Sequence, residues 1–327
     1  MDITPYLTPH KLGRPVLTGS GVAGQFDCLA VDCPTVFSHN GRFYMLFIGF
    51  DGIGYQTGLA VSDDLLHWEK QCVLFRRDSN ADWDKVGQAG VWILHDDDLY
   101  SGNPLIKVDG KYWIFYHSYP EAGYETGPAK IGAAWCEDES LLDWHFLPEP
   151  LYLPGEADAW DGGGLYKCCV VRLGGKWHMY YNAKDQDGVE QTGLAVSDDL
   201  LHWARCPENP LVRVEPGTWT SRFCSDPHVC YDSRRKTWVM FFYGFSSPYA
   251  MDGVALSGDG LYWEKYPEPI LRVGQPGELD CRYAHKPSVI YHDGKLYHYY
   301  CACRPWQEGD PADNGGEFRC ITVAVSD

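Results

Sequence analysis

A segment of 14 residues recurs along this sequence, and this recurrence limits the folds that the chain can adopt. TGLAVSDDLLHWEK at 57–70 returns almost unchanged as TGLAVSDDLLHWAR at 192–205. Looser copies are IGAAWCEDESLLDWHF at 131–146 and DGVALSGDGLYWEK at 252–265. The same place in each copy is marked by a tryptophan, at spacings of 76, 59 and 60 residues: Trp68, Trp144, Trp203 and Trp263. The repeat unit is therefore close to 60 residues with one insertion, which indicates an architecture built from one supersecondary unit.

Each repeat unit has the pattern of four strands. An apolar run ends in a tight turn such as Asn40-Gly41 or Asp293-Gly294, and an alternating aromatic run follows. These dipeptides are strong hairpin signals. The third strand is the AVS segment, and the fourth follows the tryptophan. Five such hairpins start near Pro34, Pro104, Cys168, Pro227 and Pro287. The sequence therefore predicts an all-β, five-bladed β-propeller with four-stranded antiparallel blades, as a single domain over 1–327.

The last repeat unit lacks a fourth strand in its own sequence. The chain reaches ITVAVSD at 321–327, which supplies only a third strand. The segment GRPVLTGSGVAGQFDC at 13–28 has the pattern of a fourth strand and the loop after it. We expect residues 13–18 to complete the fifth blade and close the ring, because closure removes exposed sheet edges.

Charge and cysteine content exclude several classes of partner. The formal net charge is −18, from 45 acidic and 27 basic residues, without a Lys/Arg cluster. Nucleic acid and anionic membranes are therefore not expected partners. No apolar segment has the length of a membrane span or the pattern of a signal peptide, so we expect a cytoplasmic protein. The 13 cysteines include no Cys-x-x-Cys pair, which predicts small buried side chains rather than a metal site or a disulfide framework. The oligomeric state is left open.

The loops that differ between repeats predict where a ligand binds. The turns from the second strand to the third, and from the fourth to the next unit, are long and dissimilar, and variable loops on a rigid scaffold usually carry function. These loops are 85–101, 117–130, 182–191, 244–251 and 302–318. We expect 85–101, which holds the insertion, to overhang the site and narrow it to a pocket for chain ends. The innermost strands begin at the same face with polar residues: Asp32, Asn103, Lys167, Asp226, and His285 with Lys286.

With the motifs SDPHV, VDGKYWIFY and AVSDDLLHW, the sequence resembles the five-bladed propeller glycosidases of glycoside hydrolase families 43, 32, 68, 117 and 130. The resemblance covers the whole chain and implies carbohydrate chemistry, but assigns no single family. The family 43 pattern has an Asp in blade one, an Asp in blade two and a Glu in blade three. Here Asp32 matches the first, Asn103 stands at the second, and blade three offers Asp161. No cofactor is required; related propellers hold a structural calcium ion beside a blade-five histidine, here His285.

Glycoside cleavage normally uses two carboxyl groups that flank the scissile bond. Asp32 and Asp226 are the predicted catalytic pair. Asp161 is a third candidate, although it recurs in other repeats as Asp27, Asp84 and Asp280 and so also fits a structural turn. Reserve candidates for the acid are Glu125 and Glu190. Sugar-binding candidates are Asn103, Trp160, Lys167, Arg222, His285 and Lys286, with Trp92 and Trp306 as further stacking surfaces.

The leading hypothesis is an exo-acting glycoside hydrolase for a short, imported oligosaccharide or glycoside, with a small carbohydrate as its expected partner. A phosphate-dependent glycoside phosphorylase is the first alternative, because Lys167, Arg222, His285 and Lys286 could hold an anion. A sugar-binding propeller without catalysis is the second, because the blade-two Asp and blade-three Glu are missing.

Overall fold

The computed structural model describes residues 1–77 and 82–327, and in this part of the chain the fold is all-β apart from one short 3-10 turn, η1 (Thr4–Tyr6). Its strands are β1 (His10–Lys11), β2 (Leu17–Thr18), β3 (Ala30–His39), β4 (Arg42–Phe50), β5 (Tyr55–Ser62), β6 (Glu69–Phe75), β7 (Ala89–Ile93), β8 (Tyr112–Ser118), β9 (Lys130–Cys136), β10 (His145–Phe146), β11 (Gly164–Leu173), β12 (Lys176–Lys184), β13 (Glu190–Ser197), β14 (Trp203–Arg205), β15 (Phe223–Asp232), β16 (Thr237–Ser246), β17 (Tyr249–Ser257), β18 (Glu264–Lys265), β19 (Tyr283–His292), β20 (Lys295–Pro305) and β21 (Glu317–Val325). None of the described residues forms a helix of the length and apolar character needed to cross a membrane.

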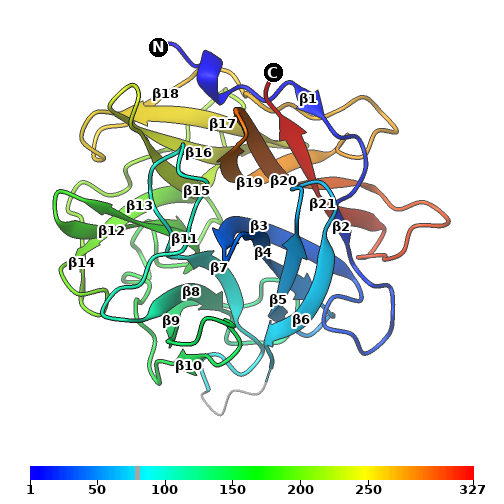
Figure 1. Cartoon of the computed structure of the whole chain (residues 1–327), viewed down its shortest axis with the longest axis horizontal. Coiled ribbons are helices and arrows are strands. Elements are labelled where there is room, and N and C mark those ends of the chain that lie inside the picture. Colours follow the sequence, from blue (N-terminus) through cyan, green and yellow to red (C-terminus); the bar gives the residue numbers. More distant parts are fainter. Residues whose placement is uncertain (78–81) are drawn as a thin grey trace.

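The strands form antiparallel groups that follow the repeat. These groups are β3 to β6, β7 to β10, β11 to β14, β15 to β18, and β19 to β21 with β1 and β2. Short parallel pairings join β13 to β15 and β17 to β19, so the last three groups form one 13-stranded sheet. The hydrogen-bonded strand order is an open path in each sheet. The inner strands β3, β7, β11, β15 and β19 gather at the centre of the view in Figure 1, where β19 also contacts β3.

The pairing of the N-terminus with the last strand follows the register of the other groups. Ala60 pairs with Lys70, Ala195 with Arg205, and Ala255 with Lys265. In the last group the repeat-equivalent Ala324 pairs with Lys11 of β1, and Leu17 of β2 pairs with Ile321. Figure 1 shows β1 and β2 beside β21. The predicted pairing of residues 13–18 is therefore confirmed for β2, and it extends back to His10.

The recurring part of the repeat forms a turn that bonds to itself. In the first copy the Ser62 hydroxyl accepts a hydrogen bond from the Leu65 amide, and the Asp64 carboxylate accepts hydrogen bonds from the amides of Leu66 and His67. The Trp68 indole N–H donates to the Leu65 carbonyl. The other three tryptophans donate in the same way, to Leu141, Leu200 and Gly260. Local hydrogen bonding thus explains why the segment SDDLLHW recurs.

In three of the strand groups, a buried carboxylate connects the turn before the inner strand to the outermost strand of the group. Asp27 pairs with Lys70, Asp161 with Arg205 at 2.9 Å, and Asp280 with Lys11 at 2.6 Å. We call these the anchor aspartates. In the group of β15 to β18, Thr220 takes the place of the aspartate, and Lys265 pairs with Glu215 instead.

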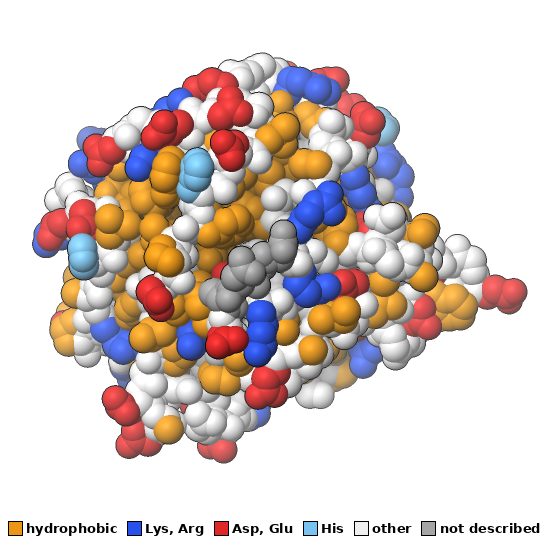
Figure 2. All heavy atoms as spheres, turned by 90° about the horizontal axis from the view of Figure 1, so that it is seen from below, with side chains coloured by type: hydrophobic (Ala, Val, Ile, Leu, Met, Phe, Trp, Pro, Cys, Tyr) orange, Lys and Arg blue, Asp and Glu red, His pale blue; other side chains and the backbone are white. Residues whose placement is uncertain are grey.

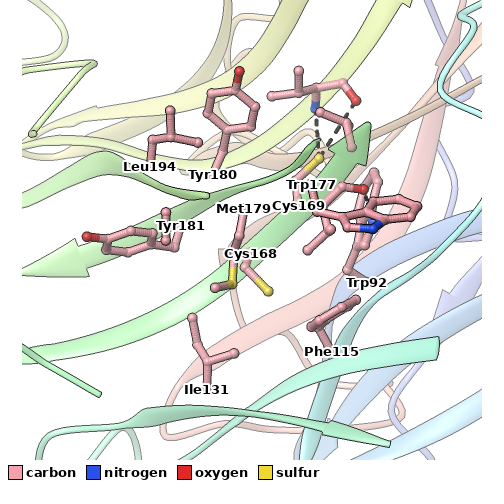
Figure 3. Close-up of a cluster of buried hydrophobic side chains, with 14 of the residues drawn as sticks. Trp92, Phe115, Ile131, Cys168, Cys169, Trp177, Met179, Tyr180, Tyr181 and Leu194 are labelled. Carbon is pink, nitrogen blue, oxygen red and sulfur yellow. Dashed lines mark hydrogen bonds between the residues drawn. The ribbon is translucent and has the colours of Figure 1, made fainter. Parts of the chain in front are cut away.

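Aromatic and sulfur-containing side chains fill the space between groups. Figure 3 shows Trp92 of β7 among Phe115, Cys168 and Met179, with its indole N–H donating to the Val170 carbonyl. Trp92 is therefore a core residue, and the expectation that it stacks on sugar is wrong. All 13 cysteines are unpaired and most are buried, as the sequence predicted. On the side seen in Figure 2, basic side chains are scattered among acidic ones.

The second repeat differs from the prediction. Its inner strand is β7, which pairs with β8, whereas Pro104 to Val108 forms no strand. Every residue of β7 is buried, and Pro104 and Lys107 are exposed, so the more apolar run takes the inner position. The insertion then runs to the opposite end of the inner strands, where the Leu99 amide donates to the Tyr231 carbonyl. The expectation that 85–101 overhangs the ligand face is therefore wrong.

Candidate active site

A cavity of about 280 Å³ lies where the inner strands β3, β11, β15 and β19 begin. This volume is close to the lower end of the roughly 300–1,000 Å³ range of small-molecule sites. Residues of the predicted loops 117–130, 182–191 and 244–251 contribute to its wall. Much of that wall is aromatic, from Tyr55, Tyr119, Tyr124, Tyr166, Tyr243 and Tyr283.

β-Bulges place side chains on the cavity wall. The register shifts between Asp32 and Thr35, between Ser225 and His228, and between His285 and Ser288. Within these bulges Cys33, Asp226 and Lys286 have φ values of 46°, 51° and 67°, each just before a proline. A bulge re-aims a side chain, and positive φ at a non-glycine residue is often found at functional sites. Cys33, and not Asp32, is therefore the structural equivalent of Asp226.

Glu190 and Asp226 share one amide donor. The Asn182 side-chain Nδ2 lies 2.9 Å from Glu190 Oε2 and 2.9 Å from Asp226 Oδ1, and it donates to both. The Tyr243 hydroxyl donates to Glu190 Oε2 over 3.2 Å. Glu190 is only 9% exposed and Asp226 only 3%. The two carboxyl groups are thus held side by side on one wall, which we call the acidic wall.

Burial changes the protonation of the acidic wall. Burial, with the charges of Glu125 and Asp226, raises the pKa of Glu190 to about 7. Burial also raises the pKa of Asp226, against the opposing effects of Lys286 and Lys167. Near neutral pH, Glu190 therefore carries a proton in a large share of molecules.

Glu125 reaches the cavity from a different element. It lies in the loop between β8 and β9, with a φ of 52°, and it is partly exposed. The Tyr55 hydroxyl donates to Glu125 Oε1 over 3.5 Å. A cavity that holds Glu125, Glu190 and Asp226 has the carboxyl groups that acid–base chemistry requires.

Asp32 does not line the cavity as a free carboxylate. It is 2% exposed, and its Oδ2 accepts hydrogen bonds from Lys286 at 2.8 Å and from Arg319. Burial alone would raise the pKa of Asp32, but Lys286 and Arg319 hold it well below its usual range. Asp32 is therefore an ionised group behind the cavity wall that bonds to two cations, and its predicted catalytic pairing with Asp226 stays a prediction that this position does not support.

The two histidines of the cavity are neutral. Burial lowers the pKa of His117 to about 3, and burial with the nearby Arg319 lowers the pKa of His285 well below its usual range. The His285 ring lies with Nδ1 3.1 Å from the Cys301 carbonyl oxygen. Calcium takes six to eight oxygen ligands. Because Lys286 and Arg319 lie beside His285, these surroundings do not fit the calcium ion that the resemblance implied.

Several predicted site residues lie elsewhere. Asp161 is an anchor aspartate, bonded to Arg205 and to the Tyr181 hydroxyl. The Asn103 amide donates to the carbonyls of Val36 and Val289, at the end of the inner strands away from the cavity. None of the following lines the cavity: Asp161, Asn103, Trp160, Arg222 and Trp306. The cavity does bring together these predicted residues: Asp226, Lys167, His285, Lys286, Glu125 and Glu190.

Other cavity residues were missed, although the repeat held a signal for them. The ends of the second strands line the cavity at equivalent positions, namely Ile48, His117, Asn182 and Tyr243. The residues equivalent to the predicted Glu190 do so as well, namely Tyr55, Ala250 and Arg319. Three of these missed residues, His117, Asn182 and Ala250, lie within the predicted loops but were not singled out there, whereas Ile48, Tyr55, Tyr243 and Arg319 lie outside those loops.

Comparison with solved structures places the protein among glycoside hydrolase propellers. A structure titled "Glycoside hydrolase" superposes with a TM-score of 0.80 at 27% identity, covering 98% of this sequence and 92% of the other. A thermostable family-43 glycoside hydrolase gives a TM-score of 0.64 at 18% identity, covering 94% and 91%, and this likeness concerns the fold alone.

Sequence comparison gives a consistent result. A xylosidase/arabinosidase of Bacteroides ovatus is 28% identical over 135 residues, which is 37% of this sequence and only 40% of that protein. Residues 99–281, more than half of the sequence, match the family described as "Glycosyl hydrolases family 32 N-terminal domain". This match shows that the protein belongs to the family of the glycosyl hydrolase family 32 N-terminal domain.

Proposed function

We propose that this protein is a glycoside hydrolase that cleaves a short oligosaccharide or glycoside in the cavity, with Glu190 as the general acid. The observation that carries the proposal is the buried, doubly hydrogen-bonded Glu190, whose pKa is raised to about 7 beside two further carboxyl groups. A general acid works best when its pKa lies near the working pH. Family membership supports the glycosidase class.

In the proposed mechanism the proton moves from Glu190 to the glycosidic oxygen as the bond to the anomeric carbon breaks. Glu125 reaches the cavity from another loop and serves as the second carboxyl group, either as base toward water or as nucleophile. Asp226 keeps the proton on Glu190 through its charge, and Asn182 holds both groups in place. Asp226 thus keeps a place in the site, whereas Asp32 and Asp161 do not act on the substrate.

The tyrosines of the cavity wall and the cavity volume support the prediction of a short substrate that is cleaved at its end. Tyrosine rings offer faces on which sugar rings stack. A cavity of about 280 Å³ suits one or two sugar rings better than a long polymer. We therefore keep the exo-acting mode as part of the proposal, although loop 85–101 does not supply it.

We also propose that the strand groups are five blades of one domain, 1–327, closed into a ring. The contact of β19 with β3 and the pairing of β1 and β2 with β21 support this. Deleting residues 1–18 should expose β21 and cause aggregation or a clear loss of melting temperature. A soluble truncation with unchanged melting would contradict the closure.

We also propose that the protein is located in the cytoplasm. The unpaired, mostly buried cysteines fit a reducing environment. Fractionation of the native host with an antibody against this protein would test it, and recovery outside the cytoplasm would refute it.

The function is tested by incubating the enzyme with a panel of aryl glycosides and short oligosaccharides, with and without phosphate. We expect free sugar without phosphate. The value of kcat/KM should fall as the pH rises above about 7, because Glu190 then loses the proton that it donates. A sugar 1-phosphate formed only with phosphate would instead establish the phosphorylase alternative, which Lys167, Lys286 and Arg319 in the cavity favour. Sugar binding without turnover would leave a binding propeller.

A further inference from the structure

The cavity that holds the acidic wall is also lined by three cations, Lys167, Lys286 and Arg319. Lys286 and Arg319 both donate to Asp32 Oδ2. Lys167 donates from Nζ to the carbonyl of Pro287, the residue next to Lys286, at 3.1 Å. All three line the cavity, and we call them the cationic wall. They come from β11, β19 and β21, so only folding puts them together.

The cationic wall has more donors than the described residues use. Lys167 is 1% exposed, and among the residues that the structure describes its ammonium has a single acceptor, the Pro287 carbonyl. The described partner of the Lys286 ammonium is Asp32, and Arg319 uses Nε toward Glu317 and Nη1 toward Asp32. An ammonium has three N–H donors and a guanidinium five. Several charged N–H groups therefore remain for a ligand.

The carboxylates that contact the cationic wall are too few to pair with all three cations. One oxygen of Asp32 serves two cations, and Glu317 contacts Arg319 alone among these three cations. Lys167 has no carboxylate within ion-pair distance among the described residues, and the charge of Asp226 acts on Lys167 and Lys286 only from a longer distance. A buried cation without a paired anion is costly unless a ligand completes its shell. A neutral sugar hydroxyl supplies one weak acceptor, whereas a carboxylate or phosphate supplies several charged ones.

We propose that Lys167, Lys286 and Arg319 form a subsite for an oxyanion of the ligand, either the carboxylate of an acidic sugar or inorganic phosphate. The proposal rests on the proposed function, because it assigns the substrate class of the same cavity. An acidic sugar would lie with its carboxylate at the cationic wall and its glycosidic bond toward Glu190. The subsite thus selects acidic over neutral sugars, or admits phosphate as a second reactant.

Binding is measured by calorimetry on full-length Glu190→Gln, so that turnover plays no part. The probes are glucuronate against glucose, galacturonate against galactose, and inorganic phosphate. For a carboxylate site, one uronate should bind at least about ten-fold more tightly than its neutral partner, and added salt should weaken the binding of that uronate. For a phosphate site, phosphate should bind while uronates match their neutral partners.

The subsite is tested with the variant Lys167→Met. Because Lys167 donates to a carbonyl, this change leaves every carboxylate with its cation. It should abolish the preference for the oxyanion in either case. The matched control is Lys176→Met, on an exposed lysine paired with Asp198. The proposal is overturned if neither uronate binds more tightly than its neutral partner and phosphate does not bind. It is also overturned if the binding preference survives in Lys167→Met. An absence of hydrolysis by the native enzyme would instead reject the proposed function and leave the binding result standing.

Discussion

Two sets of buried carboxyl groups in this protein differ in how they relate to the repeat. The anchor aspartates Asp27, Asp161 and Asp280 occupy equivalent positions, and each pairs with the outermost strand of its group. Glu190 and Asp226 stand where other repeats have different residues, and they share Asn182 inside the cavity. Repetition therefore identifies scaffold, and departure from the repeat identifies the candidate site.

The largest expected effect is on turnover, from Glu190→Gln. The amide keeps the volume and the hydrogen bonds but cannot donate the acid proton, so kcat should fall by about 10² to 10⁴. The melting temperature should stay within a few degrees of the native value. The control is Glu264→Gln, on an exposed residue of β18, with native activity expected. Full activity in Glu190→Gln would show that Glu190 is not the general acid and that departure from the repeat does not identify the catalytic group.

The next effect is on stability, from Asp32→Asn. This change leaves Lys286 and Arg319 buried with too little negative charge, and loss of one member of a buried ion pair costs about 3–5 kcal/mol. Chemical denaturation should show that loss. A variant with native stability and no turnover would restore Asp32 as a catalytic residue.

Asp161→Asn should have a smaller effect, confined to stability. Asp161 is buried against Arg205, whose side chain is 38% exposed, so solvent screens part of the interaction. We expect a loss of about 1–3 kcal/mol with unchanged kcat and KM. Asp158→Asn, on a nearby exposed residue, is the control. Loss of turnover without loss of stability would move Asp161 into the active site.

The smallest effect concerns Asp252 and His298, a fully buried pair with Oδ2 and Nε2 2.9 Å apart. Other repeats have Thr57 and Thr192 in place of Asp252, and methionine in place of His298. Asp252→Thr and His298→Met should each destabilise the protein. The double variant should be more stable than the sum of the single effects by about 0.5–3 kcal/mol. Additive effects would show that the pair is not coupled.

The sequence predicted much of the fold because the relevant signals are local. The hairpin turns, the aromatic strands and the SDDLLHW turn each depend on residues close in sequence. The second repeat was the exception, since both 89–93 and 104–108 had apolar runs. Only burial by neighbouring groups selected 89–93 as β7.

By itself, then, the sequence determined the repeat, the strand pattern, the role of the N-terminal strand beside β21, and six of the side chains that reach the cavity. Only the tertiary structure decided which carboxyl groups act together. A bulge of one residue put Cys33 rather than Asp32 at the wall, and Arg319 arrived from the last strand. Bulge position, burial and charge pairing depend on groups far apart in the sequence, and no local pattern reports them.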